Sequence, residues 1–429
     1  MKKSKKILSL LACGAIAASA TMGLAACGGD KDNTITVWAP QTQQTLVKKL
    51  VDDFLAANPD FGLKVDFGVC GEDNAYAKVS VDPQASADVY GFANDQLMNL
   101  KSCGGLSYLS DQMVNKIKET DEAAAVEAGK IGDKYYGYPY AADNGYFMYY
   151  DKSVVAEEDT TNLMSVINAC KRKHKYFVMQ METDGAWYFG SFFYGAGGKY
   201  DLEWDGDELM TATCNFDAKA VDINGTVSDY SIGEIGSRAA MDAVNNKNAA
   251  GGFIHGNDTV IEQRLKDKNL GAVITGTWNA SKIQEALGNN YAATACPQYT
   301  SSLDNHTYRM APFIGYKLYA VNGFTKHVSE SHRLAQYLAS ETAQQQRFNE
   351  LQIGPSNLKI QQTEAVKNNV ALQALFSQKD FAVVQTSLPD NYWSVLKTYA
   401  GDIYAGKITN DNLSTKLADL IKGLNVDNT

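Results

Sequence analysis

The side chains best suited to chemistry in this 429-residue chain are aromatic rings and nearby polar groups. There are 24 tyrosines, 16 phenylalanines and 5 tryptophans, and several fall where a loop should follow a predicted strand. A pyranose ring has flat C–H faces that stack on aromatic rings, and hydroxyls that bind carboxylates or amides. Candidates for these two kinds of contact are Phe92 with Asp95, Asp143 with Asn144, Trp187, Trp278 with Asn279, and Trp393. Composition alone does not choose between a sugar site and a core, because a single tryptophan is more often a core residue.

Motifs of common enzyme and metal sites do not appear in the sequence. The five histidines form no HExxH pair, no serine lies in a GxSxG elbow, and there is no Walker-type glycine loop. The segment 201–206 resembles the start of an EF-hand loop, but Ala212 stands where a glutamate is needed, so a hairpin turning at Asp205-Gly206 is predicted instead. A carboxylate pair for glycoside hydrolysis stays open, although nothing singles out one pair among 49 acidic residues. We expect no metal, no cofactor and no catalytic residue.

The elements that would position these side chains alternate between strands and helices. Apolar residues at spacings of two predict strands, and those at helical spacing predict helices. Predicted strands are 35–39, 63–69, 88–92, 175–181, 270–275, 291–296 and 317–321. Predicted helices are 42–57, 95–103, 160–173, 234–247, 257–268, 279–287 and 330–351, with further helical stripes at 362–376, 391–404 and 411–421. This order predicts an α/β fold with a largely parallel sheet and a mostly helical C-terminal segment.

The start of the chain has the layout of a secretory signal. Four lysines within residues 2–6 precede an apolar stretch, 7–24, and the run ends in Leu24-Ala25-Ala26-Cys27. Those last four residues resemble a bacterial lipobox, which implies that Cys27 becomes the first residue and carries lipid. We therefore expect a signal peptide at 1–26, a lipid-anchored tether at 27–33, and a domain held at the outer face of a Gram-positive cell membrane. An uncleaved membrane anchor is the alternative, and no later segment is apolar enough to span a bilayer.

The remaining chain is long and acidic. Residues 27–429 exceed the usual size of a single hydrophobic core, so two domains are predicted. Loss of the four signal lysines would take the net charge from −10 to about −14, which disfavours nucleic-acid binding. Five cysteines remain after Cys13 and Cys27, and no CxxC pair occurs among them. A Cys70–Cys103 disulfide and buried free thiols both stay open.

Several segments resemble, in order, the landmarks of the maltose/maltodextrin-binding proteins, which are family 1 extracellular solute-binding proteins of ABC importers. These segments are 34–59, 87–106, 132–154, 195–198, 271–278, 312–322 and 389–393. The resemblance implies a two-lobe periplasmic-binding-protein-like fold with three hinge crossings, near 141–144, 294–299 and 353–356. The first lobe would comprise 34–140 and 298–353, and the second lobe 141–297 and 354–429.

The resemblance also implies roles for particular residues. Phe92 would be the aromatic platform of the first lobe, and Asp95 would accept sugar hydroxyls. Asp143, where the family commonly has glutamate, would bind hydroxyls at the first crossing. Platforms on the other side of the cleft would be Trp187, Trp278 and Trp393.

Two departures from the family pattern leave contacts open. Ala87 replaces the proline that usually precedes the first aspartate, which affects loop geometry. Pro40 to Gln44 replaces a loop that often carries asparagine, aspartate and lysine, so the contacts of that loop are undetermined. Glu72, Asp73 and Lys78 receive no role.

The implied function is capture of a malto-oligosaccharide by lobe closure and its delivery to the permease subunits of an ABC importer. We expect a monomer that binds the membrane only through its lipid and has no catalytic activity. Two alternatives remain. One is the same fold binding another oligosaccharide, such as a xylo- or fructo-oligosaccharide. The other is a secreted carbohydrate-active enzyme.

Overall fold

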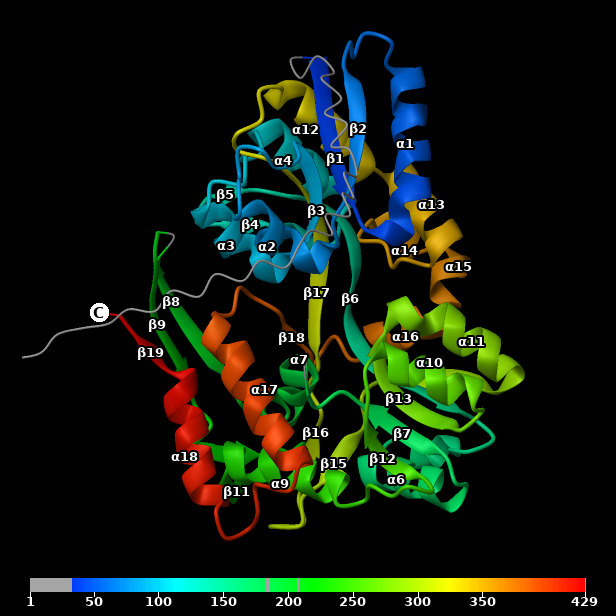
Figure 1. Ribbon diagram of the computed structural model, residues 1–429, viewed down its shortest axis with the longest axis vertical. Coiled ribbons are helices and arrows are strands. Elements are labelled where there is room, and N and C mark those ends of the chain that lie inside the picture. Colours follow the sequence, from blue (N-terminus) through cyan, green and yellow to red (C-terminus); the bar gives the residue numbers. More distant parts are fainter. Residues whose placement is uncertain (1–32, 183–184, 207, 429) are drawn as a thin grey trace, which may run out of the picture.

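The computed structural model describes residues 33–182, 185–206 and 208–428, arranged as two α/β lobes (Figure 1). The lobes share a ten-stranded sheet with the order β12-β7-β13-β6-β17-β3-β1-β2, in which β14 also pairs with β6 and β18 with β17. The predicted α/β class is therefore confirmed. The expected signal peptide, the lipid site Cys27 and most of the tether lie outside the described residues. Within the described ranges, no helix is both long and apolar enough to cross a membrane.

The first lobe forms around parallel strands. Strand β1 pairs in parallel with β2 and β3, as Val37 opposite Phe67 and Val89 shows. Helix α1 connects β1 to β2 and buries an apolar stripe that includes Leu46, Leu50 and Phe54. The elements of this lobe are β1 (Thr34–Ala39), α1 (Gln44–Ala57), β2 (Lys64–Val69), α2 (Ala75–Val79), β3 (Val89–Ala93), α3 (Leu97–Ser102), α4 (Asp111–Thr120), α5 (Ala123–Glu127), β4 (Lys130–Ile131), β5 (Lys134–Tyr135), α12 (Val328–Leu338) and α13 (Glu341–Leu351).

The second lobe has the larger core and contains most of the aromatic clusters. Its elements before the return to the first lobe are α6 (Leu163–Arg172), β7 (Tyr176–Met179), α7 (Gly185–Phe189), α8 (Ser191–Tyr194), β8 (Tyr200–Asp205), β9 (Glu208–Cys214), β10 (Lys219–Val221), β11 (Val227–Ser231), α9 (Ile232–Val244), β12 (Gly252–His255), α10 (Asp258–Lys266), β13 (Leu270–Gly276), α11 (Ala280–Leu287), β14 (Tyr291–Thr294), β15 (Gln298–Thr300) and β16 (Thr307–Arg309). The C-terminal elements are α14 (Leu358–Gln361), α15 (Glu364–Lys367), α16 (Val370–Phe376), β18 (Val383–Val384), α17 (Asp390–Tyr404), α18 (Leu413–Leu424) and β19 (Val426–Asp427). Of these, α17 and α18 pack on the second lobe.

Two long strands, β6 (Tyr138–Asp151) and β17 (Phe313–Val321), run between the lobes (Figure 1). The first half of β6 pairs with β17, with Tyr319 opposite Tyr138 and Ile314 opposite Gly145. Its second half pairs with β13 and β14 of the second lobe. The expected first crossing, 141–144, falls inside β6. The third segment, 353–356, passes beside it, because Ala142 donates its backbone N–H to the carbonyl of Gly354 at 2.9 Å.

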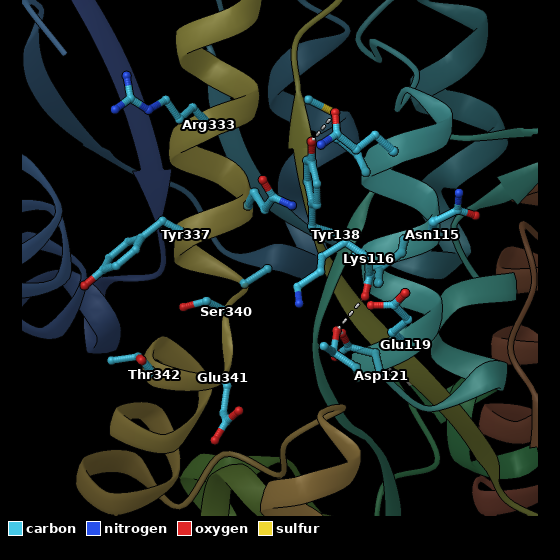
Figure 2. Close-up of a pocket in the computed structure, with 16 residues that line it drawn as sticks. Asn115, Lys116, Glu119, Asp121, Tyr138, Arg333, Tyr337, Ser340, Glu341 and Thr342 are labelled. Carbon is cyan, nitrogen blue, oxygen red and sulfur yellow. Dashed lines mark hydrogen bonds between the residues drawn. The ribbon is translucent and has the colours of Figure 1, made fainter. Parts of the chain in front are cut away.

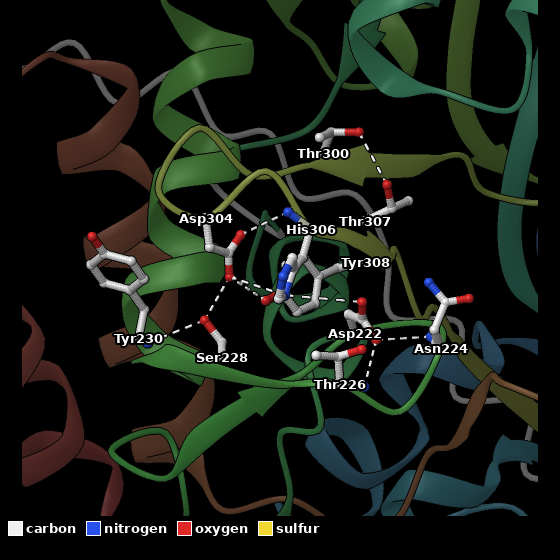
Figure 3. A network of polar contacts seen from close by, with 10 residues as sticks. All are labelled: Asp222, Asn224, Thr226, Ser228, Tyr230, Thr300, Asp304, His306, Thr307 and Tyr308. Atoms are coloured by element: carbon white, nitrogen blue, oxygen red, sulfur yellow. Dashed lines mark hydrogen bonds and ion pairs between the residues drawn. The ribbon is translucent and has the colours of Figure 1, made fainter.

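The second crossing lies later in the chain than expected. Tyr299, Tyr308 and Met310 belong to the core of the second lobe, so residues 298–312 are not part of the first lobe. A polar network also fixes this segment to the β10–β11 hairpin (Figure 3): Asp304 Oδ2 accepts hydrogen bonds from Ser228 Oγ at 2.5 Å and from Tyr308 Oη at 2.6 Å. The return to the first lobe is therefore made by β17 and not near 294–299.

Other local expectations can be compared with the structure directly. The hairpin predicted at Asp205-Gly206 is confirmed, because β8 and β9 pair with Asp205 opposite Glu208 and Gly206 has φ of +61°. The single helix predicted over 330–351 is two helices, since Ser340 caps a new helix by accepting the N–H of Ala343. All five cysteines of the described chain are free, so the Cys70–Cys103 disulfide is not formed.

Candidate functional site

A cleft of about 980 Å³ lies between the two lobes, and residues of both line it. The first lobe and β17 contribute mainly polar groups: Glu72, Asp73, Asn74, Asp95 and Lys317. The second lobe and α17 contribute three tryptophans together with polar groups at the rim. These residues are Trp187, Trp278, Trp393, Asp258, Asp390 and Lys397. One wall is thus suited to flat apolar faces and the opposite wall to hydroxyls, which is the division that a sugar ligand requires.

The tryptophans of the cleft are held by different elements, and two of them lie close together. Trp187 on α7 and Trp278 after β13 have ring centroids 5.8 Å apart and planes tilted by 37°. The indole N–H of Trp187 donates to Gln385 Oε1 at 2.8 Å, which fixes the ring orientation. Trp393 on α17 packs edge-on against Tyr392 at 5.0 Å and lies 6.4 Å from Phe313. Because each ring is braced on one side, the exposed faces are presented to the cleft in fixed positions.

Trp278 is the most exposed of these rings, with 42% of its surface accessible. It lies in a 3-10 turn, Thr277–Asn279, directly after β13. Its ring folds back over Gly276 so closely that a Cβ atom there would overlap the ring. Glycine two residues before the tryptophan is therefore required for this position of the ring.

Asp95 reaches the cleft from the turn Asn94–Gln96, at the carboxyl end of β3. Burial raises the pKa of this carboxyl group to about 7, its own backbone N–H lowers it, and the charge of Asp73 raises it further. Asp95 is therefore close to half-protonated at neutral pH. In the neutral form its hydroxyl donates a hydrogen bond, and in the ionised form it only accepts.

Asp143 does not line the cleft, contrary to its expected role. Its side chain is 1% exposed, and both oxygens are engaged by protein groups. Oδ1 accepts from Lys317 Nζ at 3.1 Å, and Oδ2 accepts from Thr277 Oγ1 at 3.1 Å and from the N–H of Gly354 at 3.0 Å. Asp143 on β6 thus ties together β17, the third crossing segment and the turn that carries Trp278.

Lys317 occupies the place at the cleft that Asp143 was expected to take. Burial lowers the pKa of the Lys317 ammonium, but the charges of Asp143, Glu72 and Asp73 and the hydrogen bond that Lys317 donates to Asp143 raise it, and the net pKa lies above its ordinary value. Lys317 therefore stays charged and offers N–H donors to the cleft.

Phe92 is also absent from the cleft lining. Its side chain is 0% exposed and packs in the core of the first lobe with Tyr90, Leu97 and Leu318. Both faces of strand β3 are buried, so the side chain of Phe92 packs in a core on whichever face of the strand it lies. A ring without accessible surface cannot stack on a sugar, and Phe92 is withdrawn from the candidate site.

Among the cleft residues that sequence reasoning missed are Glu72, Lys317 and Gln385. Glu72 follows β2 at the carboxyl end of a parallel sheet, a position that commonly faces a ligand, and this signal would have identified it. Lys317 lies in mid-strand and Gln385 in an irregular segment, so neither had a sequence signal. Gln385 contacts both lobes, since its backbone oxygen accepts from Asn94 Nδ2 at 2.6 Å while its side chain binds Trp187.

A second hollow, of about 1000 Å³, lies between α4, α12 and α13 on the first lobe alone (Figure 2). Its labelled residues include Lys116, Glu119, Arg333 and Glu341, and Tyr138 closes its inner end (Figure 2). None of its lining residues is a tryptophan. It has the size of a ligand site but lacks the tryptophan platforms found between the lobes.

Comparison with known proteins identifies the family. Residues 49–374 match the family model of bacterial extracellular solute-binding proteins, and the chain belongs to this family. No curated protein sequence matches the chain. Among solved structures, one described as being with acarbose is 26% identical, with a TM-score of 0.76, over 91% of this chain and 98% of the other.

Two further solved structures show the same fold at lower identity. The maltodextrin binding protein MalE1 from L. casei BL23, solved without ligand, is 21% identical with a TM-score of 0.72, over 91% of this chain and 98% of that one. The Thermus thermophilus maltotriose binding protein, bound with maltotriose, is 15% identical with a TM-score of 0.70 over the same shares. These likenesses show the two-lobe fold of the periplasmic binding proteins.

Proposed function

We propose that this protein captures malto-oligosaccharides in the interlobe cleft and delivers them to the permease of an ABC importer. The observation that carries the proposal is the pairing of Trp187, Trp278 and Trp393 on one wall with carboxylates on the other. The similar proteins with maltotriose and acarbose named above support the choice of an α-glucan. The lipobox-like segment ending in Cys27 supports attachment to the outer face of the membrane.

The geometry suggests how capture works. A linear sugar enters between the lobes and places its apolar faces on the tryptophans, each well-placed stack contributing on the order of 1 kcal/mol beyond the area it buries. The hydroxyls exchange water for Glu72, Asp95 and Lys317. Closure brings the two walls together, and the ligand favours the closed state by as much as it binds that state more tightly.

The crossing strands provide a suitable pivot for this motion. Asp143 connects β6, β17 and the third crossing segment, and Thr277 connects it to Trp278. A change in the angle between the lobes would therefore move the Trp278 platform and the polar wall of the first lobe each as a rigid group. No reaction is needed for transport, because the ligand is released intact.

The substrate class is tested by isothermal titration calorimetry on the mature chain. Maltose, maltotriose and maltotetraose are titrated beside xylotriose and cellotriose. Binding of the α-glucans alone supports the proposal. Binding of only xylotriose or cellotriose would keep the binding function and overturn the substrate.

The enzyme alternative is tested separately by long incubation with maltotetraose followed by thin-layer chromatography. We expect the oligosaccharide to be recovered unchanged. Shorter products would contradict a pure binding function.

A further inference from the structure

The first-lobe carboxylate Glu72 is fixed from behind while it faces the cleft. It begins a short 3-10 turn, Glu72–Asn74, and is 9% exposed. Its Oε1 accepts hydrogen bonds from the hydroxyl of Tyr140 at 2.5 Å and from the side-chain amide of Gln43 at 2.8 Å. Within the described part of the chain, both hydrogen bonds to this carboxylate end on Oε1. Oε2 is therefore the oxygen that can serve a ligand.

Tyr140 is itself immobilised by a buried cation. The Arg347 guanidinium is 0% exposed and lies 4.8 Å above the ring of Tyr140 and 5.3 Å from that of Tyr319. Arg347 donates to Tyr319 Oη at 2.7 Å and to the carbonyl of Leu338 at 2.6 Å. Burial holds the pKa of Tyr140 well above its usual range, so its hydroxyl remains a donor to Glu72.

The loop that departs from the family pattern supplies the second support. Gln43 is 5% exposed, and its amide points to Glu72 and not to solvent. The next residue, Gln44, donates to the carbonyls of Ala39 at 2.7 Å and Gly68 at 3.0 Å, which pins the loop to β1 and β2. The side chains of Gln43 and Gln44 therefore bind protein groups, and Glu72 is the neighbouring side chain that can contact a ligand directly.

We propose that Glu72 is the specificity-determining carboxylate of the first-lobe wall, binding sugar hydroxyls through Oε2, with Tyr140, Gln43 and Arg347 as positioning residues. This inference rests on the proposed sugar-binding function. A carboxylate held by two donors loses little rotational freedom when a ligand binds, so its hydrogen bonds discriminate strongly between hydroxyl arrangements. Lys317 and Asp95 stand beside it on the same wall.

The test compares three variants with the wild type by calorimetry, using the tightest-binding sugar of the panel above. Glu72→Gln keeps the shape and removes the charge, and should weaken binding by about 10- to 100-fold, as expected for a charge-assisted hydrogen bond. Tyr140→Phe should weaken it by about 3- to 10-fold. The double variant should bind like Glu72→Gln alone, because Tyr140 acts through Glu72.

The first lobe offers a matched control pair. Tyr135 Oη donates to Glu127 Oε1 at 2.7 Å, the same kind of bond outside the cleft. Glu127→Gln and Tyr135→Phe should leave the affinity unchanged. Melting temperatures of all variants separate folding effects from binding. If Tyr140 had a purely structural role, Tyr140→Phe would lower the melting temperature, and its loss of affinity would add to that of Glu72→Gln in the double variant.

The outcomes separate the two proposals. If the wild-type protein binds a sugar and Glu72→Gln binds it equally well, this inference is overturned and the sugar-binding function stands. Additive losses in the double variant would overturn the positioning role of Tyr140. If the wild-type protein binds no sugar of the panel, the proposed function fails and this inference fails with it.

Discussion

Replacing Asp143 by asparagine should destabilise the protein strongly, although the residue makes no contact with the cleft. The change leaves the Lys317 ammonium, whose side chain is only 16% exposed, without the carboxylate that it contacts at 3.1 Å. An asparagine has one acceptor oxygen where Asp143 has two. Whichever way the amide is turned, either Lys317 or the pair Thr277 and Gly354 loses its acceptor. Breaking one partner of a buried ion pair costs about 3–5 kcal/mol, and the retained amide oxygen recovers part of this, so we expect a loss of about 2–4 kcal/mol.

Urea unfolding followed by circular dichroism measures this loss. The matched control is Asp60→Asn, which breaks an exposed ion pair with Arg333 at 3.0 Å, where the side chains are 70% and 41% exposed. That change should cost less than about 1 kcal/mol, because solvent screens the pair. A second variant, Asp143→Asn with Lys317→Met, removes the orphaned cation and should recover part of the stability. Equal losses for Asp143→Asn and Asp60→Asn would refute the assignment of Asp143 as the hub of the crossings.

Three further predictions concern Asp95, Gly276 and His332. Because the folded-state pKa of Asp95, about 7, lies above its unfolded value, the stability from this group is lost as pH rises toward 7. Urea unfolding should therefore show Asp95→Asn becoming more stable relative to the wild type from pH 4 to 7, and a constant difference between the two would contradict the raised pKa. Gly276→Ala should displace the Trp278 ring, so calorimetry should show about a 10-fold or greater loss of sugar affinity, and an unchanged affinity would contradict the close packing. Burial lowers the pKa of His332 to about 4, so its ring should show no titration near pH 6.5 by NMR, and the contribution of this residue to stability should be lost as pH falls from 6.5 toward 4.

The regular elements were largely predictable, because their apolar residues follow the periods of helices and strands. The helix predicted at 42–57 is found as the turn Gln41–Gln43 followed by α1. Its stripe of buried residues is the one that the spacing indicates. The strand predicted at 88–92 is β3, displaced by one residue. The spacing of apolar residues does not show which side chains of a strand buried on both faces reach a cleft. This is why Phe92 was wrongly predicted to line the cleft.

Long-range polar contacts could not be predicted from local pattern. Asp143 looked like a ligand residue because it lies at the first crossing. In the folded chain its oxygens are engaged by Thr277 and Gly354, which are 134 and 211 residues away in sequence. The same holds for residues 298–312, whose place in the second lobe depends on the packing of Tyr299 against Phe192, 107 residues away, with Tyr308 stacked on Tyr299. Trp187, Trp278 and Trp393, by contrast, do lie at the cleft where sequence reasoning placed them.

The most direct test of the account is whether the tryptophans of the cleft hold the sugar. Calorimetry with maltotetraose should show binding by the wild-type chain and a loss of about 10- to 100-fold in Trp278→Ala and in Trp393→Ala, as expected for truncated aromatic anchors. Trp204 lies on β8, outside the cleft, and Trp204→Ala should bind like the wild type. Unchanged affinity in both cleft variants, or an equal loss in Trp204→Ala, would contradict the assignment of the interlobe cleft as the sugar site.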